Sequence, residues 1–213
     1  MEKNMNSVLN LKEIEKRAFR STYQDGLWDI YYGLVVISMG FFIYHPKTGY
    51  SWINIAMMVG SLLIAYSLFY LGKKFITFPR LGQVVFGETR KQKKRLMILF
   101  ISIVVSFQVL LLLATAFGWK LGFSEGRLNE HLLVSLIASL IVYAGMTIIT
   151  YFSDFLRGFY ISFLMALAVF LMVYFNQIIY AVAIGLIIVI PGIVLLVRFL
   201  YRYPLIKIED HHE

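Results

Sequence analysis

The sequence predicts an all-α membrane protein, a six-transmembrane-helix bundle preceded by an amphipathic interfacial helix. Composition supports this first, because 60% of the 213 residues are hydrophobic and only 15% are charged, against about 45–50% and 25% in soluble domains. Distribution supports it second, because the apolar residues gather into six windows long enough to cross a hydrocarbon core about 30 Å thick. A soluble domain of this length has too little interior to bury them.

The six windows contain a single formal charge, Asp29, which lies in the first turn of the first window. Backbone groups in lipid must form hydrogen bonds within their own segment, so each window is expected to be helical. We expect a transmembrane domain over residues 27–205, a segment 1–26 before it and a short tail 206–213. The predicted spans are residues 28–44, 52–71, 97–118, 132–152, 158–175 and 178–197.

Lysine and arginine predict the orientation. Seventeen of them fall in the segments that share a side with the two termini, and three fall on the opposite side. Loops rich in Lys and Arg stay in the cytoplasm. We therefore expect both termini to be cytoplasmic, with the protein in the plasma (inner) membrane.

Residues 7–24 are expected to form the amphipathic helix. Val8, Leu11, Ile14 and Ala18 recur at helical spacing, while the basic residues lie mostly on other faces. Such a helix either lies on the inner leaflet or simply leads into the first span. Its basic face and the adjacent membrane favour the first interpretation.

The predicted cytoplasmic loop, residues 72–96, is the largest segment between spans on that side. Pro79 and Gly82 favour a turn near its start, and its end is strongly basic. Anionic lipid attracts such a cluster by about 1 kcal/mol per cation. Nucleic acid attracts the same side chains, but no interleaved aromatic residues accompany them, so we expect no nucleic-acid partner. The predicted anionic-lipid-binding residues are Arg90, Lys91, Lys93, Lys94 and Arg95.

Two hairpins share a pattern that suggests an internal repeat. A shift of 129 residues aligns Asp25 with Asp154, and a shift of 125 aligns Lys73 with Arg198. Apolar hairpins with basic ends also share this much without common origin, so both explanations stay open. Repeats are common in transporters. Small residues four apart, which permit close helix packing, occur at positions 56 and 60 and at 181 and 185.

Charged residues are expected to gather where the helices meet the cytoplasm. Asp29 needs a partner at the edge of the hydrocarbon, and we expect that partner to be Arg80 or Arg157. Such a pair either anchors the structure or forms a proton or substrate site, and anchoring is favoured. The candidate cluster consists of Asp25, Asp29, Arg80, Asp154 and Arg157.

Pro191 and Gly192 are expected to kink the last span, as a static bend rather than a hinge. We predict no catalytic residue, metal or cofactor. The sequence has no cysteine and no H-E-x-x-H, G-x-S-x-G or P-loop motif. On the opposite side from the termini, His45 and the Glu130-His131 pair are poorly arranged for a metal ion.

Two stretches resemble signatures of a family of small prokaryotic multi-pass membrane proteins with no assigned function. They are Asp25-Gly-Leu-Trp-Asp-Ile and Phe78-Pro-Arg-Leu-Gly-Gln-Val, and the resemblance covers about the first 85 residues. The resemblance implies that one structural or functional unit at the cytoplasmic face is formed by Asp25, Gly26, Pro79, Arg80 and Gly82. It implies neither an activity nor a cofactor.

Three functions remain open from the sequence. We favour a non-enzymatic scaffold or regulatory component that acts through its basic cytoplasmic face, with anionic lipids, a further protein and a second copy as candidate partners. The alternative is a small transporter or channel for an apolar or amphipathic solute. The third is a lipid-modifying enzyme that uses Asp25, Asp29 and Asp154.

Overall fold

The computed structural model describes residues 23–43, 52–81, 92–104, 106 and 130–204, and these residues are helical apart from short turns. An unlabelled helix covers residues 92–104. The labelled elements are α2 (Leu27–Ile43), α3 (Trp52–Gly72), η1 (Lys73–Thr77), α4 (Phe78–Leu81), α6 (Glu130–Phe152), α7 (Leu156–Phe175) and α8 (Ile179–Arg202).

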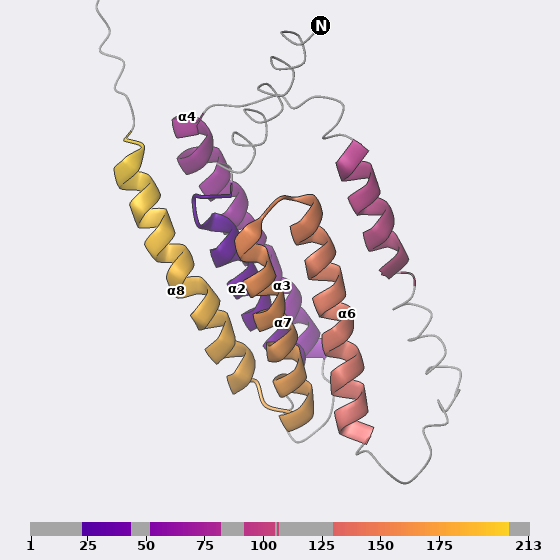
Figure 1. The fold of residues 1–213 in the computed structure, drawn as a ribbon. Helices are drawn as coiled ribbons and strands as arrows, with labels where there is room; N and C mark the ends of the chain where they lie inside the picture. The colour runs from indigo at the N-terminus through magenta and orange to yellow at the C-terminus, as the bar shows by residue number, and fades with distance from the viewer. Residues whose placement is uncertain (1–22, 44–51, 82–91, 105, 107–129, 205–213) are drawn as a thin grey trace, which may run out of the picture.

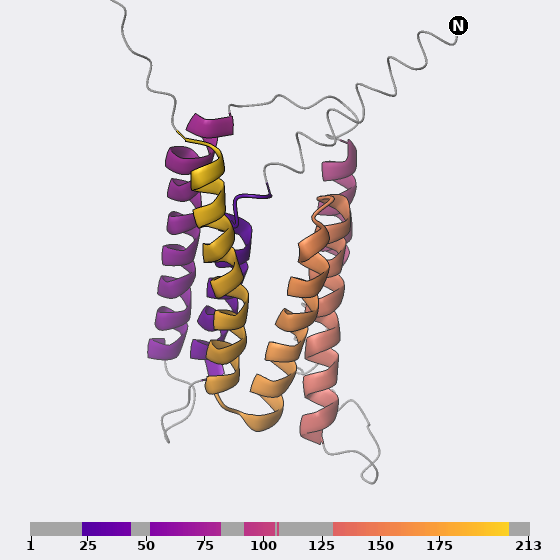
Figure 2. The same cartoon turned by 60° about the vertical axis from the view of Figure 1, so that its left-hand side comes forward.

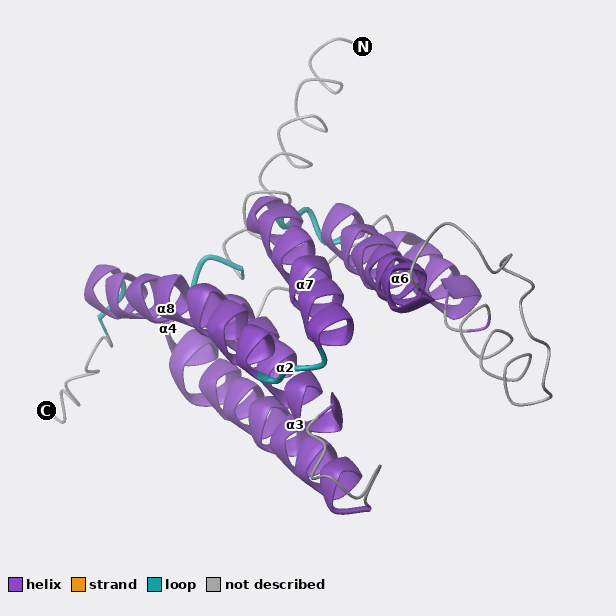
Figure 3. Cartoon of the chain, turned by 90° about the horizontal axis from the view of Figure 1, so that it is seen from below, coloured by secondary structure: helices purple, strands orange, loops and turns teal. Residues whose placement is uncertain are grey.

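The long helices stand side by side as an up-and-down bundle (Figure 1). α2 packs between α3 and α8, and α7 packs between α8 and α6. Figures 2 and 3 show the resulting arrangement. α2, α3 and α8 form one group, α6 and the 92–104 helix form the other, and α7 lies between them against α6. We call the end where α2 and α7 begin and α8 ends the charged end; it is uppermost in Figure 1.

Among the described residues, four helices are long and apolar enough to cross a membrane, and α2 is a shorter apolar helix. Their outward faces carry large apolar side chains, such as Trp52 at 86% exposure and Leu63 at 62%. Lipid rather than water is the solvent that such faces match. The protein is therefore an all-helical, multi-pass membrane protein in its described part. The four candidate spans are Trp52–Arg80, Leu132–Phe152, Leu156–Phe175 and Ile179–Arg202.

Most predicted windows match a helix, with differences at their ends. The second span does not end at residue 71, because the helix continues to Leu81 through the region predicted as loop. The predicted loop is also shorter at its other end, where a helix begins at residue 92. The amphipathic helix of residues 7–24 and most of the 97–118 window lie outside the described residues.

Glycines set the distance between α2 and α8. Gly33 and Gly40 are seven residues apart and lie on one face of α2, and Gly26 precedes the helix at the same spacing. A Cβ atom on Gly33 would lie 2.8 Å from the carbonyl oxygen of Gly185, and a Cβ on Gly185 would lie 2.8 Å from that of Gly33. The backbones thus touch at this crossing, as small residues allow in membranes.

The predicted pairs of small residues behave differently. Ala181 is fully buried and lies opposite Gly40, where an added Cβ would be 3.0 Å from its own. Gly60 in α3 has no neighbouring atom within 4 Å in the described part of the chain. Close packing therefore uses the pair in α8, whereas Gly60 faces open space.

Candidate functional site

Asp25 forms the most completely buried charged site at the charged end. Its carboxylate has no exposed surface, and its Oδ2 atom lies 2.6 Å from the Lys73 ammonium group. The Thr77 hydroxyl donates a second hydrogen bond to the same oxygen, also at 2.6 Å. Oδ1 accepts the backbone N–H of Leu27 at 3.2 Å, so Asp25 also caps the start of α2. We call Asp25, Lys73 and Thr77 the Asp25 cluster.

The π-helical turn η1 presents both partners to Asp25. Its backbone is widened, with the N–H of Phe78 bonded to the carbonyl of Lys73, five residues back. Lys73 and Thr77 are four residues apart and lie on the same side of this turn. Their bonds to one carboxylate hold residues 73–77 in a helix. This is the physical reason why the predicted loop does not begin at residue 72.

Packing brings α3 close enough for these bonds. Gly72 accepts the Leu27 side chain, whose Cδ2 would lie only 2.9 Å from an added Cβ. The Lys73 ammonium lies 6.0 Å from the ring centre of Trp28 and 5.8 Å from that of Phe69. An ammonium group is stabilised by such aromatic faces and by a carboxylate, which together offset the cost of its burial.

Asp29 binds Arg157, one of the two arginines expected beside it. The closest oxygen and nitrogen are 3.1 Å apart, but this contact lacks hydrogen-bond geometry and acts through charge alone. The other terminal nitrogen of Arg157 donates to the Tyr23 carbonyl at 2.5 Å. Arg80 takes no part, because its guanidinium group donates to the carbonyl of Ile76 in its own helix. Arg157 thus ties the start of α7 to the start of α2.

Asp154 forms its ion pair with a different helix from those that Asp25 and Asp29 contact. It occupies the turn between α6 and α7 with a left-handed backbone (φ 51°), and its carboxylate lies 3.7 Å from Lys93. Lys93, Lys94 and Arg95 are exposed in the first turn of the 92–104 helix. Arg90 and Lys91, the other two predicted lipid-binding cations, lie outside the described residues.

Pro191 and Gly192 lie inside α8, which continues as one helix from Ile179 to Arg202. Gly192 faces the first turn of α2, where an added Cβ would be 2.9 Å from the Ile30 nitrogen and 3.0 Å from the Asp29 Cβ. The absence of a side chain at Gly192 therefore allows α8 to pack closely against α2. The predicted kink stays a prediction.

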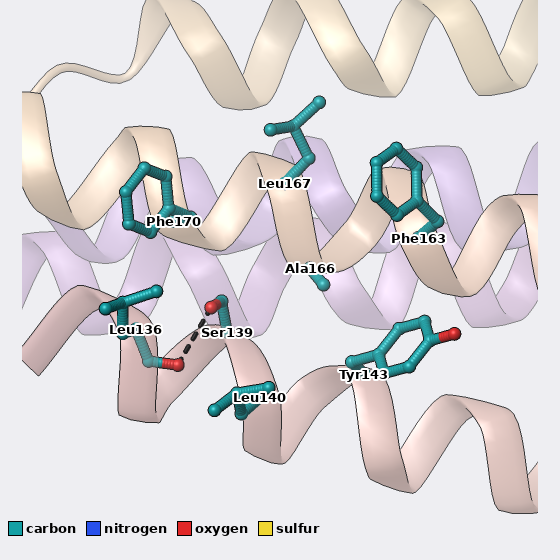
Figure 4. A pocket seen from close by; sticks show the side chains of 8 residues that line it. All are labelled: Leu136, Ser139, Leu140, Tyr143, Phe163, Ala166, Leu167 and Phe170. Atoms are coloured by element: carbon teal, nitrogen blue, oxygen red, sulfur yellow. Dashed lines mark hydrogen bonds between the residues drawn. The ribbon is translucent and has the colours of Figure 1, made fainter.

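Several pockets lie among the described residues. One of about 450 Å³ lies between α6 and α7 and has apolar walls, with Ser139 and Tyr143 as its polar members (Figure 4). A second, of about 410 Å³, lies between α2 and α3 and is also apolar. A third, of about 360 Å³, lies at the charged end and is lined by arginines. In these residues no group of three acidic or histidine side chains is arranged to hold a metal ion.

Asp25 and Arg157 were predicted as site residues from the sequence, whereas Lys73, Thr77, Arg198 and Arg202 were not. Lys73 contributed only to the count of basic residues and to the repeat alignment with Arg198, and the one hint of its role was the spacing of four that separates it from Thr77. Comparison of the chain with protein-family models, with curated proteins and with solved structures finds no match.

Proposed function

We propose that this protein is a non-enzymatic component of the cell membrane, a scaffold or regulatory subunit that acts through its charged end. The main support is that the buried charges hold helices together. Asp25 joins the start of α2 to the end of α3, and Asp29 joins α2 to α7. Groups engaged in this way stabilise an interaction platform and are poorly placed to exchange protons with a substrate.

The arrangement of the aspartates argues against a lipid-modifying enzyme. Such chemistry would need Asp29 and Asp154 to converge on one lipid-sized pocket. Each instead contacts a different cation, Arg157 for Asp29 and Lys93 for Asp154. Asp25 has no exposed surface with which to touch a substrate.

The exposed cations at the charged end include Lys93, Lys94 and Arg95 at the start of the 92–104 helix, and these are available to a partner. The strong bias of Lys and Arg toward this side supports a topology of six spans with both termini in the cytoplasm, in the plasma membrane. In that orientation, the basic residues 90–95 meet anionic lipid and an acidic surface on a protein partner.

The orientation has a direct test, because the chain contains no cysteine. Single substitutions Lys207→Cys and Thr48→Cys place one thiol on each predicted side. A membrane-impermeant maleimide applied to intact cells is expected to label the Thr48→Cys protein and to spare the Lys207→Cys protein until the cells are opened. The reverse pattern, or labelling of both in intact cells, would refute the topology.

The scaffold function is tested by copurification. The full-length protein is isolated in mild detergent, and whatever accompanies it is identified and quantified by mass spectrometry. Substitution of the five cations in residues 90–95 by Gln is expected to remove a stoichiometric protein partner. Neutralisation of Lys47, Lys120 and Arg127, which lie on the predicted opposite side, serves as the control and is expected to retain it. Recovery of the wild-type protein without any stoichiometric partner would refute the proposal.

The pocket between α6 and α7 favours a second candidate, a small transporter for an apolar or amphipathic solute. It is about 450 Å³ in volume, within the range of about 300–1,000 Å³ of small-molecule sites. Leu140, Phe163 and Phe170 form its apolar walls (Figure 4). If this pocket belongs to a transport path, Ala166→Phe will fill it and block solute flux into liposomes. Equal flux with and without the protein would exclude this candidate for the solute tested.

A further inference from the structure

Three arginines meet in a pocket where α7 begins and α8 ends. Arg157 comes from the first turn of α7, and Arg198 and Arg202 come from the last turns of α8. We call this cavity of about 360 Å³ the arginine pocket. We propose that it binds the phosphate group of an anionic phospholipid, one molecule per chain.

The charge of the pocket is strongly positive. Arg157 is balanced by Asp29, whereas no carboxylate of the described part of the chain lies within ion-pair distance of Arg198 or Arg202. Guanidinium groups bind phosphate oxygens through paired N–H donors, which gives both strength and geometry. Two such groups one helical turn apart can hold a single phosphate between them.

The remaining lining favours an amphipathic ligand. Gln24 adds a polar side chain, while Leu195 and Phe199 provide apolar walls. The Tyr203 ring packs on Phe199 at 5.1 Å and lies 6.0 Å from the Arg202 guanidinium carbon. The backbone N–H groups at the start of α7 and the carbonyl groups at the end of α8 contribute potentials of opposite sign here, so the positive charge of the pocket comes from its arginine side chains.

The surface of α8 below the pocket suits acyl chains. Ile187, Ile190 and Val194 precede Arg198 at intervals of three and four residues, so they form one stripe that leads to it. They are 48%, 58% and 49% exposed. A phosphate at the arginines with hydrocarbon along this stripe matches a phospholipid, whereas free phosphate would leave the stripe unused.

The inference assumes, as the proposed function does, that the charged end lies at a membrane surface. It does not depend on a protein partner, so failure to find such a partner leaves it intact. Conversely, if the purified protein carries no bound phospholipid, the result of the protein-partner copurification still stands.

The test uses the full-length protein in a mild detergent at high salt, where native mass spectrometry counts bound phospholipid. High salt screens loose surface attraction, while direct phosphate contacts survive. The wild-type protein is expected to retain one anionic phospholipid, to take up phosphatidylglycerol and to ignore phosphatidylcholine. Arg198→Gln with Arg202→Gln is expected to lower lipid affinity at least tenfold, because each charge-assisted hydrogen bond contributes roughly a factor of ten or more.

Lys47→Gln with Lys120→Gln removes the same charge from the predicted opposite side of the membrane and is the control. It is expected to retain the lipid. Arg198→Lys with Arg202→Lys, which keeps the charge but loses the paired donors, is expected to bind with intermediate affinity. The thermal unfolding temperature of each variant is measured as well. An unchanged value shows that lost lipid binding does not result from a folding defect.

Three results would overturn the proposal. One is equal lipid loss in the Arg198/Arg202 pair and in the control pair. Another is retention of inorganic phosphate by the wild-type protein with no phospholipid bound, which would make free phosphate the ligand. The third is lipid uptake only after Glu209→Gln with Asp210→Asn, which would make the acidic tail the occupant of the pocket.

Discussion

The α2–α3 and α7–α8 hairpins begin alike and differ in how they use charge. Each follows an aspartate, Asp25 before α2 and Asp154 before α7, in the register that the suspected repeat predicts. Asp25 is fully buried against Lys73, at 2.6 Å. The Asp154 side chain is 16% exposed, and its contact with the exposed Lys93 is longer, at 3.7 Å. Arg198, which the repeat aligns with Lys73, lines the arginine pocket instead.

This difference shows that a shared sequence pattern does not carry a shared ion pair. In the first hairpin the aspartate engages the cation, and the pair holds two helices together. In the second hairpin, Asp154 has a left-handed backbone, and its carboxylate contacts Lys93 of the 92–104 helix instead of a cation of α8. The cations of α8 are thereby left without a carboxylate among the described residues, which is the condition for binding an anionic ligand.

The strongest test of this comparison is Asp25→Asn. It leaves the Lys73 ammonium buried without a carboxylate, and loss of one member of a buried pair costs about 3–5 kcal/mol. We expect a decrease of that order in the free energy of unfolding, measured by equilibrium unfolding in mixed micelles. Asp154→Asn, the matched control in the second hairpin, should change it by less than about 1 kcal/mol.

A double variant refines this test. Asp25→Asn with Lys73→Met removes both charges, and replacement of a buried pair by apolar groups is often neutral. We expect most of the lost stability to return. Similar effects of Asp25→Asn and Asp154→Asn would mean that the two aspartates are equivalent and would contradict the comparison.

The next largest effect concerns the contact that joins the two hairpins. Gly33→Leu would force a side chain against the Gly185 carbonyl and the Val189 side chain, 2.8 and 2.5 Å from the new Cβ. Overpacking costs roughly 1–3 kcal/mol, so we expect a lower thermal unfolding temperature in detergent. Gly60→Ala, at a position with open space, should be neutral or slightly stabilising. Equal sensitivity at both glycines would refute close α2–α8 packing.

The smallest effect is expected for Asp29→Asn. Arg157 keeps its bond to the Tyr23 carbonyl and is 36% exposed at its side chain, so solvent compensates part of the lost charge. We expect a loss of about 1 kcal/mol in the free energy of unfolding. Protein-partner binding, measured by the copurification assay, should persist. Unchanged stability together with lost binding would show that Asp29 serves function rather than anchoring.

The candidate site was only partly predictable. A partner for Asp29 was predictable, because an isolated carboxylate at the edge of the hydrocarbon is energetically costly. Arg157 was one of the two predicted partners. Asp25 was expected in the cluster, but Lys73 was not. Nothing in sequence spacing says which of many basic residues near the charged end reaches a given aspartate.

The sequence by itself determined that the chain is helical and apolar enough to cross a membrane. Composition and window length suffice for this, because lipid leaves the backbone no partner outside its own segment. The tertiary structure decided which charges meet. Glycine contacts bring α2 against α8, and the Asp25 cluster extends α3 past its predicted end. Charge attracts in every direction, so only the packing of the backbones selects Lys73 for Asp25 and leaves Arg198 and Arg202 to line a pocket.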